Sequence, residues 1–202
     1  MTDPHQLLKS IFGFDHFRGV QEEVIGRVLG GRHTLGVMPT GAGKSLCYQL
    51  PAVAREGTAL VISPLIALMH DQIRSANSIG LRAASLTSAD ADRDQTMQRF
   101  NAGELDLLYV APERATGDAF RRLVSRAELA LIAIDEAHCV SEWGHDFRPD
   151  YRQLRMLLDD NADASGQGFE LSVPGGHHSA ERRLEHAGPL VRKRLRHLHR
   201  GG

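Results

Sequence analysis

The chain lacks the features that would place it outside the cell or in a membrane. Only two of its 202 residues are cysteine, Cys47 and Cys139, too few for a disulfide framework, which indicates a reducing compartment. No apolar run approaches the roughly 20 residues of a membrane-spanning helix. The first ten residues, MTDPHQLLKS, are polar and include an early acid, so we expect no secretory signal. These absences together favour a cytoplasmic protein with no membrane partner.

Strong net charge is also missing. The whole chain carries a net charge of −1, which gives no sign of nucleic-acid binding, although a groove can be basic on a neutral protein. Residues 1–160 hold 17 Lys and Arg against 21 Asp and Glu, whereas residues 161–202 hold 7 against 4. The second segment also contains 7 of the 20 glycines and 5 of the 11 histidines. This shift predicts one folded domain over residues 1–160 and a divergent, mostly disordered Gly/His/Arg-rich tail over residues 161–202.

Within the first 160 residues, short apolar runs alternate with helical periods. The runs HTLGVM (33–38), TALVIS (58–63), LDLLYV (105–110) and LALIAID (129–135) are typical of strands buried on both faces. Segments with helical spacing lie between and around them, at 20–30, 44–56, 65–80, 92–103 and 151–160. Strands and helices in alternation predict an α/β fold whose parallel sheet is flanked by helices.

The stretch MPTGAGKSLCYQLP, which starts at Met38, follows the first run and opens a helical segment. Glycines at 41 and 43 allow backbone N–H groups to face an anion, and the following helix adds its positive end. Lys44 would reach the outer phosphates of a nucleotide, and the Ser45 hydroxyl would bind Mg2+. Thr40 belongs to the same loop. The usual phosphate-loop pattern has glycine in place of Met38, and the alternative is a plain glycine-rich turn.

A phosphate loop needs an acidic partner on a neighbouring strand, and LALIAIDEAH supplies one. Asp135 and Glu136 follow the apolar run directly, at the edge where open α/β sheets bind ligands. Asp135 would hold Mg2+, and Glu136 would orient or deprotonate the attacking water. Two acids after a strand are otherwise a helix cap or a solvated turn. Together with Lys44 they predict transfer of the terminal phosphoryl group of ATP to water.

With CVSEWGHDFRPDY directly after DEAH, the chain closely resembles the RecQ-type DNA helicases of superfamily 2. The resemblance runs in continuous order through FGFDHFRGVQ, MPTGAGKSLCYQLPA, VISPLIALMHDQ, LLYVAPER and IDEAHCVSEWGHDFRPDY. It implies a RecA-like phosphate-loop domain that binds ATP and Mg2+ and acts on single-stranded and partly duplex DNA with 3′-to-5′ polarity. A bacterial member would be associated with the nucleoid. The protein partners stay unknown.

The resemblance also assigns residues around the adenine. The amide of Gln21 is able to pair with the adenine edge and so select ATP over GTP, although on sequence alone a solvated helix residue is the simpler interpretation. Phe14 could stack on the base, and Arg18 is the neighbouring contact. The family usually has proline in place of Gly19, which loosens the loop that carries Arg18.

Further residues are predicted to contact DNA. Ser63 and Pro64 end a strand and open a helix, where backbone N–H groups can meet a phosphate. Arg114 is a second phosphate contact or a solvated arginine. The loop after the carboxylates offers aromatic faces to stacked bases and a charge beside them, unless its rings fill the core. These loop residues are Trp143, His145, Phe147 and Arg148.

The pattern of such helicases stops after residue 160. We find no motif III strand, no second RecA-like domain and no zinc-binding cysteine set in the remaining sequence. The sheet is therefore expected to lack its motif III strand, unless FELSV (169–173) inserts in its place. A frameshift, a pseudogene product and a standalone module with a basic tail are the competing explanations. The prediction is a RecQ-type ATP-dependent DNA helicase reduced to its first motor domain, with little activity alone; the alternative is an ATP- or single-stranded-DNA-binding module without motor activity.

Overall fold

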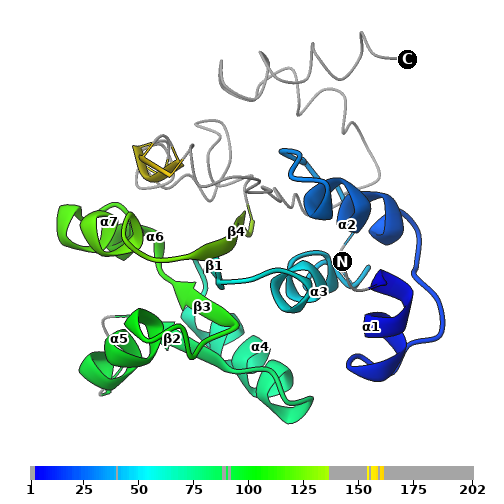
Figure 1. The fold of residues 1–202 in the computed structure, drawn as a ribbon, viewed down its shortest axis with the longest axis horizontal. Helices are drawn as coiled ribbons and strands as arrows, with labels where there is room; N and C mark the ends of the chain where they lie inside the picture. The colour runs from blue at the N-terminus through cyan, green and yellow to red at the C-terminus, as the bar shows by residue number, and fades with distance from the viewer. Residues whose placement is uncertain are drawn as a thin grey trace, which may run out of the picture.

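The structure, a computed structural model, describes residues 3–39, 41–87, 90, 92–136, 154, 156–158 and 160–161. Four strands and seven helices lie along these residues, besides helical residues at 154, 156–158 and 160 (Figure 1). In chain order they are α1 (Pro4–Ser10), α2 (Gln21–Leu29), α3 (Leu46–Ala54), β1 (Thr58–Ile62), α4 (Ile66–Ser78), β2 (Ala83–Leu86), α5 (Arg93–Asn101), β3 (Leu107–Val110), α6 (Pro112–Ala115), α7 (Asp118–Val124) and β4 (Leu129–Ile134).

The strands form one parallel sheet in the order β2-β3-β1-β4. In this register Ile62 of β1 lies between Val110 of β3 and Ile134 of β4, so three strands end at the same level. At least one helix connects each strand to the next, as parallel pairing requires. The carboxyl ends of β1, β3 and β4 therefore form a common edge, and the loops that follow them are neighbours.

Both faces of the sheet are covered, which explains why every residue of β1, β3 and β4 is buried. On β1, Ala59 and Val61 point into a core shared with α1–α4, whereas Leu60 and Ile62 point into a core shared with α5–α7. Figure 1 shows α2 and α3 on one side of the sheet and α5–α7 on the other. The predicted α/β fold with a helix-flanked parallel sheet is confirmed.

Three of the four predicted strands are confirmed, and the first is wrong. Residues 33–38 form no strand; only Val37 makes an isolated bridge, and its side chain is 40% exposed. An extended segment is held by ladder hydrogen bonds, and apolar composition alone does not provide the neighbouring strand that makes them. The sequence also missed β2, because AASL contains no run of large apolar residues.

The far edge of the sheet is formed by β4. All six of its residues are buried, and within the described ranges it pairs with β1 alone. Of the expected tail over 161–202, the structure describes only Asn161, which is buried and donates from Nδ2 to the oxygen of Leu157. The rest of the tail, including FELSV, lies outside the described residues, so its predicted disorder and its insertion into the sheet stay predictions. The helix predicted at 151–160 falls only partly within them, with Leu154 and Leu157 buried in the α5–α7 core.

One glycine is required where α3 is joined to β1. Gly57 has a φ of +90°, and a Cβ built there would lie 2.5 Å from the backbone oxygen of Glu128. Gly80 has nearly the same φ, +89°, but a Cβ there would meet nothing within 4 Å. A side chain at position 80 would therefore meet only the strain of the left-handed backbone. A side chain at position 57 would meet the same strain and also a clash with the residue before β4.

We expect Gly57→Ala to lower the free energy of unfolding by at least about 2 kcal/mol, because strain and displacement of β4 add together. Chemical denaturation measures this loss, with Gly80→Ala as the matched control that carries the backbone strain alone. Equal stability of the two variants would contradict the packing described between Gly57 and Glu128.

Candidate functional site

The glycine loop leads into α3 at the carboxyl edge of the sheet. Gly41 and Gly43 both have a positive φ, 80° and 72°, and the N–H of Ala42 donates to the oxygen of Pro39 (3.2 Å). Lys44 and Ser45 form the turn that opens α3, with Ser45 at its N-cap. Thr40 lies outside the described residues. Phosphate binding needs backbone N–H groups that face the anion and a helix that begins directly after the loop. The positive φ of the two glycines and the start of α3 supply both.

The two carboxylates follow β4 immediately. The N–H of Asp135 donates to the oxygen of Ile62 (2.8 Å), so Asp135 is fixed to the end of β1. Glu136 has a φ of 52°, and its N–H donates to Oδ1 of Asp135 (3.0 Å). A left-handed backbone is uncommon for a residue with a Cβ and costs about 1–3 kcal/mol. Strain of this kind indicates that the surrounding structure holds Glu136 in place.

The loop and the carboxylates meet. Nζ of Lys44 lies 3.8 Å from Oε1 of Glu136, and both side chains are largely buried, with 15% and 17% exposed. These residues are 92 positions apart in the chain but come from the start of α3 and the end of β4. The structure thus joins the predicted phosphate-binding cation to the predicted catalytic carboxylate.

The side chain of Gln21 contacts the glycine loop. It is 3% exposed; Nε2 donates to the oxygens of Ala42 (3.0 Å) and Gly43 (3.1 Å), and Oε1 accepts from the N–H of Arg18 (2.8 Å). A Cβ at position 43 would lie 2.6 Å from Nε2, so Gly43 is needed for this approach. The solvated interpretation of Gln21 is wrong. In this arrangement its amide is occupied by the backbone, so reading adenine would require it to exchange partners.

The other two residues assigned to the adenine lie together beside Gln21. The guanidinium of Arg18 sits 5.8 Å from the centre of the Phe14 ring, a cation–π distance. Phe14 is 46% exposed, so it is accessible from solvent. Phe14, Arg18 and Gln21 therefore form one group, which contacts the glycine loop through Gln21.

The residues that would hold Mg2+ fit that ion. Ser45 and Asp135 are oxygen donors, and both act on Tyr48: burial first, then Tyr109 and Asp135, raise the pKa of Tyr48 well above 10.0, while a side-chain bond with Ser45 lowers it. Among the described residues no three His, Cys, Asp or Glu side chains form a metal cage. Mg2+ needs no such cage, because it commonly binds one or two side chains plus nucleotide phosphates.

The structure changes how Ser63 can contact a phosphate. Its N–H already donates to the oxygen of Val110 (3.2 Å), and Pro64 has no N–H, so the expected backbone contact from these two residues is not available. Instead, Oγ of Ser63 and Nε of Arg114 are buried without a hydrogen-bond partner in the described part of the chain. They follow β1 and β3, which are adjacent strands. Buried donors without partners carry a cost that a bound anion would remove.

The aromatic-rich loop is not described. Trp143, His145, Phe147 and Arg148 all lie outside the described residues, so their role in DNA binding stays a prediction. Sequence reasoning did not find Tyr48, Tyr109 or Gln49, which are buried polar residues beside the site. Their only sequence signal was a polar side chain inside an apolar run.

Comparison with known families decides which kind of domain this is. Residues 18–168 match the DEAD/DEAH box helicase family, and this span contains the glycine loop, Asp135 and Glu136. The chain belongs to the DEAD/DEAH box helicase family. The matched span starts at Arg18, so it also takes in Gln21.

The resemblance of this DEAD/DEAH box domain to RecQ-type helicases is confirmed by its relatives. It is 49% identical over 160 residues to the ATP-dependent DNA helicase RecQ of Haemophilus influenzae, which covers 78% of this chain and 26% of that protein. It is 44% identical over 155 residues to the RecQ of Bacillus subtilis, covering 75% of this chain and again 26% of the relative. The chain therefore spans about a quarter of the length of these relatives.

Solved structures agree on the fold of the DEAD/DEAH box domain. The DUF1998 helicase MrfA superposes with a TM-score of 0.68 at 21% identity, over 93% of this chain and 31% of that one. A hypothetical ATP-dependent RNA helicase from Sulfolobus tokodaii gives 0.63 at 18% identity, over 94% and 55%. At these identities the likeness concerns the fold alone. It confirms the expected RecA-like architecture.

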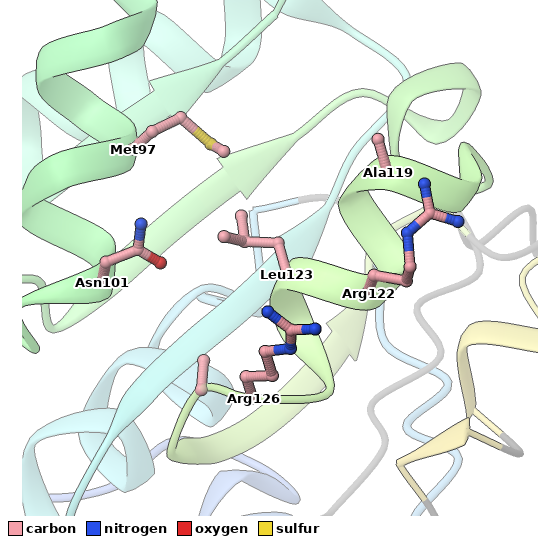
Figure 2. Close-up of a pocket in the computed structure, with 7 residues that line it drawn as sticks. Met97, Asn101, Ala119, Arg122, Leu123 and Arg126 are labelled. Carbon is pink, nitrogen blue, oxygen red and sulfur yellow. The ribbon is translucent and has the colours of Figure 1, made fainter.

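A hollow in the helicase domain lies away from this site. Figure 2 shows it between α5 and α7, where Met97 and Leu123 point toward each other; its volume is about 410 Å³. Asn101 ends α5 before β3 begins, and Arg126 precedes β4, so the hollow reaches toward the amino ends of the strands. It is therefore separate from the edge that carries Lys44 and Glu136.

No helix in the described ranges has the length and apolar character to cross a bilayer.

Proposed function

We propose that this chain binds ATP with Mg2+ and forms the first motor domain of a RecQ-type ATP-dependent DNA helicase. The observation that carries the proposal is the 3.8 Å approach of Lys44 Nζ to Glu136 Oε1. It unites a phosphate-loop cation with an acid at the carboxyl end of a parallel strand, where α/β sheets bind ligands.

The residues of the site would act in sequence on ATP. The backbone N–H groups of the loop and the ammonium of Lys44 would bind the β- and γ-phosphates. Lys44 would thereby leave Glu136, whose carboxylate could then orient the attacking water and accept its proton. Ser45 and Asp135 would hold Mg2+, which would supply positive charge to neutralise the phosphates.

Two neighbouring groups would supply recognition. Phe14, Arg18 and Gln21 would receive the adenine once the Gln21 amide leaves the loop carbonyls. Ser63 Oγ and Arg114 Nε would bind a DNA phosphate, which is supported by their burial without partners among the described residues. The start of α4, whose N-cap Leu65 makes no side-chain cap bond, would add its own N–H groups. The DNA partner would be single-stranded or partly duplex.

A second candidate is a module that binds ATP or single-stranded DNA without acting as a motor. The short span of the chain relative to its relatives, about 26% of their length, favours this candidate for the isolated polypeptide. Both candidates share the same nucleotide site, and they differ in whether hydrolysis drives movement.

Competition binding tests the proposal. A fluorescent ATP analogue with Mg2+ should bind the purified chain, and unlabelled ATP should displace it at lower concentrations than GTP. A labelled single-stranded oligonucleotide should bind in the same preparation, and its affinity should fall in Arg114→Gln but stay unchanged in the exposed variant Arg93→Gln. A folded chain that binds no nucleotide would overturn the proposal.

A further inference from the structure

The hollow between α5 and α7 has an apolar base and a cationic rim (Figure 2). Its base is formed by Met97, Leu123 and Ala127, which are half-buried and pack against the core on the α5–α7 face of the sheet. Its rim carries the guanidinium groups of Arg122 and Arg126, both exposed. Its volume of about 410 Å³ lies within the range of about 300–1,000 Å³ that ligand sites in proteins occupy.

The two arginines of the rim have no ion-pair partner in the part of the chain that the structure describes. Arg121, their neighbour in α7, is by contrast bound by both Asp118 and Asp160. Two unpaired guanidinium groups beside apolar side chains favour an occupant that carries a carboxylate next to apolar groups.

The described residues end close to this hollow. Oδ2 of Asp160 accepts from Nε of Arg121 (2.7 Å), and Arg121 directly precedes Arg122 in α7. Phe169 follows Asn161 by eight positions, which an extended chain can span over about 26 Å. A helix with its side chains is only about 10–12 Å wide. The segment that starts at Phe169 can therefore pass around α7 and reach the rim.

The chemistry of that segment matches the hollow. In FELSV (169–173), Glu170 lies between Phe169 and Leu171, and no Lys or Arg occurs from 162 to 180. In a strand added beside β4, by contrast, Glu170 would point into one of the two apolar cores of the sheet, where an unpaired charge is costly. The hollow provides the same apolar contacts and places cations beside the carboxylate.

We propose that residues 169–173 of this chain dock in the hollow between α5 and α7. Phe169 and Leu171 contact the apolar base, and Arg122 and Arg126 bind the carboxylate of Glu170. The hollow lies toward the amino ends of the strands, so the docked segment leaves the nucleotide edge of the sheet free. The inference therefore does not depend on the proposed function.

Limited digestion of the whole chain by chymotrypsin, followed by mass spectrometry, tests the docking. The bond after Phe169 should be cut at least about 10-fold more slowly than in a synthetic peptide of residues 162–180, because the protease cuts only the undocked form. In the double variant Arg122→Glu/Arg126→Glu, cleavage should be roughly 3- to 30-fold faster than in the wild type, since two ion pairs become repulsive. Glu170→Arg should also speed cleavage, and its combination with the double variant should restore protection.

The matched control is Arg32→Glu/Arg93→Glu, which makes the same change in net charge at exposed arginines that do not line the hollow. It should be cut at the wild-type rate. Wild-type cleavage as fast as that of the peptide would show that the segment is free, and the inference would be wrong. Protection that survives in Arg122→Glu/Arg126→Glu would place the segment elsewhere, for example beside β4. Protection that increases with protein concentration would assign the occupant to a second copy and overturn docking within one chain.

Discussion

Lys44→Ala is expected to abolish measurable binding of a fluorescent ATP analogue in the presence of Mg2+. The ammonium lies 3.8 Å from Oε1 of Glu136 and is largely buried. Its loss would leave the phosphates without their main positive partner and would remove the ion pair with Glu136. Truncating one member of a buried charge pair costs about 2–5 kcal/mol, which is roughly a 30- to several-thousand-fold loss of affinity.

The control for this variant is Lys9→Ala. Nζ of Lys9 lies 3.3 Å from Oδ1 of Asp15, but both side chains are more than two-thirds exposed, at 77% and 73%. Exposed pairs contribute about 0–1 kcal/mol, so Lys9→Ala should bind the analogue as the wild type does. Unchanged affinity in a folded Lys44→Ala chain would refute the phosphate-loop assignment.

The second large effect concerns turnover. The purified 202-residue chain should hydrolyse ATP at least about 10³-fold more slowly than a full-length RecQ relative in the same assay, even with single-stranded DNA present. An arginine finger contributes about 10³–10⁵ in rate, or roughly 4–7 kcal/mol. The chain spans about 26% of that relative's length. The resemblance to RecQ-type helicases implies that the finger belongs to a second RecA-like domain, for which we find no pattern in the sequence.

Glu136→Gln is the control that identifies genuine turnover. Gln retains the size of the side chain but cannot accept a proton from water, so any slow hydrolysis by this site should disappear. Activity that survives in Glu136→Gln belongs to a contaminant. Turnover of several per second in the wild-type chain, lost in Glu136→Gln, would contradict the expectation of a slow enzyme.

The sequence predicted the parts of the site that depend on local pattern. The loop at Lys44 and the acids at Asp135 and Glu136 each follow from a strand, its end and the residues directly after it. Their meeting could also be expected, because both lie at the carboxyl edge of a parallel sheet. Local pattern was enough wherever the backbone path alone decides the position of a side chain.

Contacts between distant segments were not predictable in this way. Gln21 bonds to the carbonyls of Ala42 and Gly43, which lie 21 and 22 positions further along the chain. The contact of Tyr48 with Tyr109 spans 61 positions. Nothing in either local segment marks its partner. The wrong strand at 33–38 has the same cause, since a strand is defined by a neighbour that lies elsewhere in the chain.

The two cores on either side of the sheet have a consequence for how this domain can evolve. The glycine loop opens α3, and Tyr48 packs in the layer of α1–α4. On the other face, the core shared with α5–α7 contains none of the residues proposed to contact the nucleotide. Substitutions in that layer need only preserve volume and apolar character. We therefore expect the α1–α4 layer to tolerate fewer substitutions than the α5–α7 layer without loss of nucleotide binding.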